Sequence, residues 1–364
     1  RGELKDFHYY LCRQLKGGGM EIYMKQKKVT FADIAAYTGF SKTTISRYFN
    51  NPDSLTLENQ EKIAHALDVL GYQENKLAKV LANGKSEFVG IIIPNLYLHY
   101  YSEMLNQLLS TYEKYNYKFL VFIGNNKKEI EEKYIHELMA YKIEGLIVLS
   151  NTISSEELAS YKLPVVTIER ECDHVCSVST DNYLGGVQAT SLLIRNKCDV
   201  ILHINSIFPD TLPTYGRIRG FEDICNEHHV VHELIQRNLG NTYQETLTQL
   251  KNIFNEIEEK YPSQKKGVFL ANDTYASMFL NLIFQKYGKL PKDYQIVGFD
   301  DSPIASEAIL PITTVGQQIE KIAQTAMELL VLQMNEMKKR KPAPLKEPVH
   351  KQITPVLIRR DTTK

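Results

Sequence analysis

Three polar residues in one short segment are suited to reading the edges of DNA bases. Lys42, Thr43 and Arg47 fall within a helix-forming stretch that runs from about Ser41 to Phe49. An arginine can donate two hydrogen bonds to guanine O6 and N7, a lysine can donate to guanine, and a threonine offers a hydroxyl and a methyl group. A phosphate contact or a surface ion pair would use the same arginine, so the surrounding elements decide between these roles.

Three predicted helices position these residues. We expect the helices over about 31–37, 41–49 and 57–70, with Gly39 and Gly71 ending the first and the third. Two helices joined by a short glycine-containing turn form a helix-turn-helix, whose second helix enters the major groove. Short hydrogen-bonding residues near the helix starts and turns suit phosphate contacts, with helix capping as the alternative: Thr30, Ser41, Thr44, Ser46 and Asn50. This pattern predicts a small all-α DNA-binding domain.

From residue 87 onward, apolar runs alternate with amphipathic stretches. The predicted strands are 88–93, 119–123, 146–149, 165–168, 200–204, 268–271 and 296–299. The predicted helices are 103–115, 129–141, 184–196, 215–227, 242–260, 275–287 and 318–338. Such alternation predicts parallel α/β sheets, and roughly 280 residues fit two lobes around a cleft better than one large sheet.

Side chains that follow these runs could bind a ligand, because the cleft of such a fold lies at the carboxyl ends of its strands. Tyr100 and Tyr101 follow the first run and offer aromatic faces to a sugar or a base, with ordinary packing as the alternative.

Asp300 and Asp301 could instead form the acid pair of a glycoside hydrolase, which places two carboxylates across the scissile bond. Adjacent strand residues point to opposite faces, and neither a nucleophile-base arrangement nor a glycine-rich phosphate loop is visible. We therefore expect no enzyme and no cofactor. Asp181 and Asp273 are expected to cap helices.

Composition limits the class of protein. The chain has 364 residues, 43% of them hydrophobic, and 43 basic against 43 acidic residues, which excludes a globally basic nucleic-acid binder. Residues 24–86 nevertheless carry nine basic and six acidic residues, a net charge of +3. Five cysteines without zinc-ligand spacing predict free thiols, with the pair Cys172 and Cys176 as a redox alternative. We expect no metal, no membrane span and a cytoplasmic location.

The first 28 residues look foreign to the fold. Lys16-Gly17-Gly18 is what a purine-rich ribosome-binding site encodes when translated, so we expect the natural start at Met20 or Met24. A disordered native arm is the alternative.

An ordered set of motifs from Val29 to the C-terminus resembles the LacI/GalR family of bacterial transcriptional repressors. The motifs are Val29 to Ala35, Gly39-Phe40-Ser41, Thr44 to Asn50, Leu70-Gly71-Tyr72, Asn75 to Leu81, Asp181-Asn182 with Gly185-Gly186, Arg217 to Phe221, Gly298 to Asp301 and Thr313-Thr314-Val315. The resemblance implies a helix-turn-helix domain (29–73), a hinge helix and linker (74–86), and a two-lobed, periplasmic-binding-protein-like effector domain (87–364). We expect the N-lobe over 87–183 and 315–345, and the C-lobe over 184–314 and 346–364.

The family's hinge helix corresponds to residues 75–82. The resemblance implies that it folds on DNA, where Leu81 would wedge into the minor groove and the small Ala78 would allow the paired helices to approach. A linker whose Leu81 packs on the effector domain is the alternative. Glu74 and Lys79 depart from the proline and the arginine that are common in the family.

The resemblance also assigns effector contacts. Arg217 matches the family position that reaches the effector, and its planar fork can bind hydroxyls, a carboxylate or a phosphate. Asp300 fits the complementary role of accepting hydroxyl hydrogen bonds, and Asn272 is a further candidate.

The family implies a homodimer on a pseudo-palindromic operator, controlled by a small molecule such as a sugar or sugar phosphate. We therefore expect the repressor of a carbohydrate-utilisation operon. Two alternatives stay open: a global catabolite regulator with a phosphoprotein co-regulator, and a cytoplasmic solute-binding module.

Overall fold

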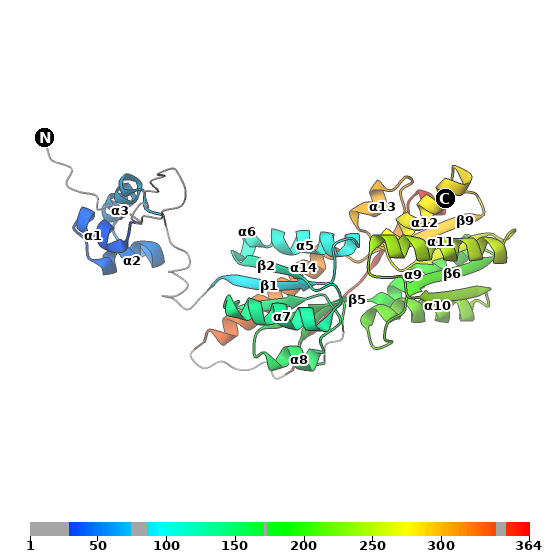
Figure 1. Cartoon of the computed structure of the whole chain (residues 1–364), viewed down its shortest axis with the longest axis horizontal. Coiled ribbons are helices and arrows are strands. Elements are labelled where there is room, and N and C mark those ends of the chain that lie inside the picture. Colours follow the sequence, from blue (N-terminus) through cyan, green and yellow to red (C-terminus); the bar gives the residue numbers. More distant parts are fainter. Residues whose placement is uncertain (1–28, 74–85, 171–172, 340–346) are drawn as a thin grey trace, which may run out of the picture. The chain divides into compact units, whose positions relative to one another are not determined.

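The computed structural model of the chain describes residues 29–73, 86–170, 173–339 and 347–364. The chain divides into two compact units, Arg1–Gly84 and Lys85–Lys364, which are treated separately (Figure 1). The expected leader (1–28) and the hinge residues Ala78 and Leu81 lie outside the described residues, as do Cys12 and Cys172.

The first unit is a bundle of short helices around a very small core. Its elements are α1 (Phe31–Thr38), α2 (Lys42–Asn50), the 3-10 turn η1 (Pro52–Ser54) and α3 (Leu57–Leu70). Ile34, Ile45, Ile63 and Ala66 are fully buried at its centre, one or two from each helix. So small a core is supplemented by stacked aromatic rings, among them Phe31 and Phe49 at 5.2 Å between ring centroids.

Local signals define the helix ends of this unit. Ser41 Oγ accepts a hydrogen bond from Thr44 N at 3.1 Å and so caps α2. Gly39 (φ 75°) and Gly71 (φ 60°) end α1 and α3 in the left-handed conformation that glycine adopts without strain. The predicted three-helix pattern is confirmed to within one residue at the helix ends.

The second unit contains two six-stranded sheets, and each sheet defines one lobe. The strands of the first sheet, in spatial order, are β11 (His350–Ile353), β5 (Cys176–Thr180), β4 (Val165–Ile168), β3 (Gly145–Val148), β1 (Phe88–Ile93) and β2 (Lys118–Ile123). Those of the second sheet are β12 (Val356–Ile358), β10 (Thr313–Gly316), β9 (Tyr294–Asp300), β8 (Lys266–Leu270), β6 (Val200–Ser206) and β7 (His232–Arg237). All pairs are parallel except β10 with β12.

Helices cover both faces of each sheet, which buries the apolar strands on two sides. Those of the first lobe are α5 (His99–Ser110), α6 (Tyr112–Tyr115), α7 (Lys128–Ala140), α8 (Ser155–Ser160) and α14 (Ile319–Met337). Those of the second lobe are α9 (Asn182–Arg195), α10 (Gly216–Glu227), α11 (Tyr243–Lys260), α12 (Asp273–Tyr287) and α13 (Pro303–Glu307), with the short turns η2 (Pro213–Tyr215) and η3 (Asp361–Thr363).

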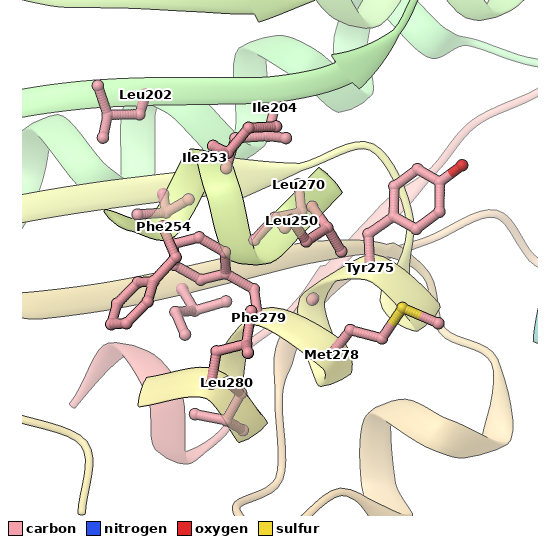
Figure 2. Packing of buried hydrophobic residues seen from close by; sticks show 14 of the residues in the cluster. Leu202, Ile204, Leu250, Ile253, Phe254, Leu270, Tyr275, Met278, Phe279 and Leu280 are labelled. Carbon is pink, nitrogen blue, oxygen red and sulfur yellow. The ribbon is translucent and has the colours of Figure 1, made fainter. Parts of the chain in front are cut away.

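The two faces of each sheet carry separate apolar clusters. In the first lobe α5 and α14 cover one face, and α7 and α8 cover the other. In the second lobe α9 and α10 cover one face, and α11 and α12 cover the other. Figure 2 shows the cluster formed with α11 and α12, in which the hydroxyl of Tyr275 points away from the other labelled side chains.

The described chain passes between the lobes at three points: after β5, after β10 and after β11. Hydrogen bonds connect these crossings, since Asp181 N donates to Ile353 O at 2.9 Å and Gln318 Nε2 donates to Thr354 O at 2.5 Å. These three crossings are the segments that would bend in a hinge movement of the lobes.

Two expectations need correction. The N-lobe and C-lobe were expected to exchange at 314 and 346, whereas β10 stays in the second sheet to Gly316 and β11 belongs to the first. β11 is a mostly exposed edge strand, so it lacks the apolar run that marks a strand. Asp273 was expected to cap α12, but Asn272 is the cap, through a 2.8 Å hydrogen bond from Tyr275 N to its Oδ1. Asp181 does cap α9, accepting from Leu184 N at 3.0 Å.

Two glycines allow α9 and α10 to approach closely. A Cβ at Gly220 would lie 2.4 Å from Tyr183 O, and one at Gly186 would lie 2.4 Å from Arg217 O, both backbone atoms. We expect Gly220→Ala to lower the free energy of unfolding by about 1–3 kcal/mol, because the helices must separate. Chemical denaturation measures this loss, with Asn226→Ala on the exposed side of α10 as the control. Equal stability of the two variants would contradict the assigned contact.

Candidate nucleic-acid interface and ligand cavity

The second helix of the first unit presents its predicted base-reading residues to solvent. Lys42, Thr43 and Arg47 are exposed on α2, whereas Ile45 of the same helix is buried in the core. Thr43 and Arg47 are four residues apart, so they lie on one face of the helix. The packing of Ile45 therefore fixes which side of α2 is open to a partner.

The predicted phosphate contacts are engaged within their own helices. Ser41 Oγ and Thr44 Oγ1 are 2.9 Å apart, and Asn50 Nδ2 donates to Ser46 O at 3.0 Å. Thr30 Oγ1 donates to Asp33 Oδ2 at 2.6 Å. Thr30, Ser41 and Thr44 are thus engaged at helix starts, as the capping alternative expects, whereas the bond between Asn50 and Ser46 lies within α2. A hydroxyl keeps a lone pair or proton for a second partner, so phosphate contact stays a prediction.

A cavity of about 190 Å³ opens where the strands of both lobes end. The first lobe contributes residues that follow β1, β3 and β4, and the second lobe contributes residues at the ends of β6, β8 and β9. All five predicted effector residues line it: Tyr100, Tyr101, Arg217, Asn272 and Asp300. Its volume is below the roughly 300–1,000 Å³ of drug-sized ligand sites, which favours a small ligand.

Arg217 is held rigidly at this cavity. Its Nε donates to Asn182 Oδ1 at 2.7 Å and its Nη1 donates to Ala271 O at 2.6 Å. The guanidinium also lies 3.7 Å above the ring centroid of Phe299. Of its nitrogens, Nη2 has no hydrogen bond to the described residues. The close approach of α9 and α10 brings Arg217 within reach of Asn182, so the glycines described above help to build the site.

Asp300 ends β9 in an unusual backbone conformation. Its φ of 115° is one that non-glycine residues rarely adopt and that recurs at binding sites. The carboxylate is buried and accepts a hydrogen bond from Gln317 Nε2 at 2.5 Å. Burial raises its pKa to about 7, against the opposing effect of the Arg217 charge. The neighbouring Asp301 instead pairs with Arg360, 2.6 Å away, so the two aspartates do not form an acid pair.

The two tyrosines lie in the first turn of α5 rather than in a loop. Their rings meet edge to face at 5.3 Å between centroids. The Tyr100 hydroxyl is buried and has no hydrogen-bond partner among the described residues. Burial raises the pKa of both side chains above the usual range, so they stay neutral hydroxyl donors at physiological pH. An orphan hydroxyl beside a cavity is suited to a polar ligand.

Two cavity residues that were not predicted from the sequence, Glu169 and Gln317, connect the lobes. Glu169 follows β4 and accepts hydrogen bonds from Thr180 N and from Asn182 Nδ2, the latter at 2.8 Å. Asn182 in turn accepts from Arg217, so a carboxylate of the first lobe is linked to the guanidinium of the second. The position directly after a buried strand was the signal that could have identified Glu169.

Gln317 completes the connection at the crossing that follows β10. Its Oε1 accepts from Thr180 Oγ1 at 2.6 Å, while its Nε2 donates to Asp300. Thr180 precedes the first crossing and Gln317 lies in the second. The polar groups of the cavity are therefore hydrogen-bonded to the segments that must bend when the lobes move.

Ligand affinity should depend on pH through Asp300. The pKa of Asp300 is raised to about 7, so below pH 7 the side chain is mostly protonated. It must then lose its proton before the carboxylate can accept a hydrogen bond from a ligand hydroxyl. We expect the ligand Kd to rise by up to about tenfold per pH unit below 7 and to level off above it. Titration calorimetry between pH 5.5 and 8.5 measures this, and Asp300→Asn should flatten the profile. An unchanged slope in Asp300→Asn would assign the dependence to another group, such as Asp273, whose pKa burial also raises.

These features define a class of protein. The first unit presents exposed donors from the second helix of a helix-turn-helix, and the second unit encloses a cavity at the hinge of two parallel sheets. Such a combination is a DNA-binding regulator with a ligand-receiving domain. Within the described residues, no group of histidines, cysteines and carboxylates could hold a metal ion, and no helix is long and apolar enough to cross a membrane.

Comparisons with known proteins agree with this class. Residues 30–75 match the model of bacterial regulatory proteins of the lacI family, and residues 191–363 match that of periplasmic binding protein-like domains. The sucrose operon repressor of Streptococcus mutans is 26% identical over 82% of this chain and 91% of its own length. The ribose operon repressor of Halalkalibacterium halodurans is 24% identical over 92% of this chain and 97% of its own length.

The fold is also that of a solved regulator. The lac repressor dimer bound to operator and an anti-inducer superposes with a TM-score of 0.76, covers 93% of this chain and 99% of its own, and is 22% identical. The chain is thus a DNA-binding transcriptional regulator whose helix-turn-helix matches that of the lacI family.

Proposed function

We propose that the chain represses a carbohydrate-utilisation operon and leaves its operator when a sugar or sugar phosphate enters the cavity. The cavity carries the proposal, because it gathers a guanidinium, two carboxylates and an unpartnered tyrosine hydroxyl in a chain with this helix-turn-helix. Relatives described as sucrose and ribose operon repressors support a sugar as the effector.

DNA is bound by two copies of the helical unit. A net charge of +3 around one unit supplies a modest attraction, so a homodimer that binds two half-sites of a pseudo-palindrome accounts better for specific binding. Lys42, Thr43 and Arg47 read the bases, and Thr30, Ser41, Thr44, Ser46 and Asn50 position the phosphates. Ala78 and Leu81 act at the minor groove, although both lie outside the described residues. Such a regulator acts in the cytoplasm, where the chromosome is accessible.

Ligand and DNA are coupled by a shift between open and closed lobes. A ligand that contacts Arg217 and Asp300 in one lobe and Tyr100 in the other favours closure. Thr180 N donates to Glu169, Gln317 Nε2 donates to Asp300, and Thr180 Oγ1 donates to Gln317 Oε1; these bonds support transmission of that closure to the hinge.

Selection of fragments from the source genome tests the proposal. Protein starting at Met24 is mixed with the fragments at fixed salt, with and without a panel of sugars and sugar phosphates. We expect enrichment of pseudo-palindromes beside a sugar operon and their release by one compound. If the protein bound DNA fragments without sequence preference and only at low salt, but bound a ligand tightly, the solute-binding module would be favoured instead.

A further inference from the structure

The charges around the cavity narrow the class of ligand. We propose that the cavity accepts a neutral polyhydroxy compound and excludes phosphorylated and carboxylate-bearing ones. This inference rests on the proposed effector function. Of the two proposed effector classes, it selects the free sugar and rejects the sugar phosphate.

The single guanidinium at the cavity has little capacity left for an anion. Arginine binds phosphate best through two parallel N–H groups. In Arg217, Nε donates to Asn182 Oδ1 at 2.7 Å and Nη1 donates to Ala271 O at 2.6 Å, and one face is covered by the ring of Phe299. The Nε–Nη2 edge has therefore lost one of its two parallel donors, and Nη1 of the other edge is shared with Ala271 O.

Buried carboxylates outnumber that cation. Glu169 and Asp300 line the cavity. Their exposed fractions are 7% and 3%, so water screens them poorly. Burial and the charge of Asp300 raise the pKa of the nearby Asp273 well above its usual range, so Asp273 is not counted as a further charge. A phosphate dianion beside the Glu169 and Asp300 carboxylates would be repelled, whereas a neutral hydroxyl can donate to them.

The neighbouring helix starts do not compensate for this charge. Helix N-termini bind anions through their free N–H groups. At the start of α12, the Asn272 side chain already accepts from Tyr275 N, and Asp273 occupies the first turn with a carboxylate. At the start of α5, His99 N donates to Thr274 Oγ1 at 3.0 Å. The starts of α5 and α12 are therefore both engaged by side chains.

The remaining lining groups are suited to a neutral polyol. The unpartnered Tyr100 hydroxyl can donate to it or accept from it. Tyr101, Phe208 and Tyr275 add aromatic surface for the C–H faces of a sugar ring.

Matched pairs of compounds test the exclusion on the full chain. Ribose, fructose and glucose are compared with their phosphate esters by titration calorimetry at constant ionic strength, and inorganic phosphate serves as the smallest anionic probe. We expect no saturable binding of any phosphorylated compound or of phosphate. Saturable binding of one of these anions that Arg217→Lys removes would overturn the proposal.

A variant that lacks the two cavity carboxylates provides a second, independent test. In Glu169→Gln/Asp300→Asn inorganic phosphate should bind saturably at concentrations at which the wild type shows no saturation, because two repulsive carboxylates are gone. The absence of phosphate binding to a folded variant would count against the electrostatic cause. If no neutral sugar in a wide panel binds while the anions remain inert, the exclusion holds and the proposed effector function fails. The two claims are thus separable.

Discussion

Arg47→Ala should abolish selective operator binding while leaving the fold intact. The side chain of Arg47 is exposed on α2 and has no hydrogen bond or ion pair to the described residues, so its removal leaves no partner unsatisfied. A bidentate contact with guanine contributes about 1–3 kcal/mol of discrimination, and a dimer makes it in each half-site. The expected loss of affinity is therefore large, and it can be measured by fluorescence anisotropy with the selected operator.

Arg47→Lys distinguishes whether Arg47 contacts a guanine base or a phosphate. A lysine keeps the charge but loses the planar fork, so guanine preference should weaken while binding to unrelated DNA is retained. Lys62→Ala is the matched control, since Lys62 is an exposed basic residue on α3 that pairs with Glu58. If Arg47→Lys bound the operator and its guanine-substituted form as the wild type does, Arg47 would be a phosphate contact.

Arg217→Lys should remove the response to ligand. The arginine is 6% exposed, and a lysine cannot donate to Asn182 and Ala271 together while it also covers Phe299. Hydrogen bonds of charged groups contribute about 1.5–3 kcal/mol each, so we expect the ligand Kd to rise at least about tenfold. Calorimetry measures the affinity, and anisotropy measures whether the ligand still releases the operator.

A control on the same helix isolates the cavity from the fold. Arg219 is exposed two residues further along α10. Among the described residues its side chain donates to Asp210 O alone, and it lies over the Tyr215 ring, so Arg219→Lys should behave as wild type. Ligand affinity that fell equally in both variants would mean that α10 itself had been disturbed. Unchanged affinity in Arg217→Lys would remove Arg217 from the site.

The interior of the fold could be predicted from sequence because buried parallel strands are apolar throughout. The runs at 88–93 and 165–168 became β1 and β4 without any shift of their ends. The missed strands lack that signal: β7 is half-buried along its whole length, and the residues of β5 are mainly small and polar. Their pairing depends on neighbours that are distant in the chain.

The candidate cavity was predicted where residue type and position after a strand coincided, as for the two tyrosines, and where a motif resembled the family, as for Arg217. Arg217, Asp300, Asn272 and the two tyrosines all line it. Gln317 was missed because its role comes from the hydrogen bonds to Thr180 and Asp300, which only the folded crossings create. Asp273 was misjudged because either of two adjacent residues can cap a helix, and the backbone conformation selects Asn272.

Reciprocal linkage between operator and ligand tests the central claim most directly. Once a releasing sugar is known, its Kd is measured with and without saturating operator, and the operator Kd with and without saturating sugar. Coupled sites must change each other's affinity by the same factor, typically about 5- to 150-fold. We predict equal factors in that range, with the operator weakening sugar binding. A sugar affinity that operator leaves unchanged would contradict a ligand-controlled repressor.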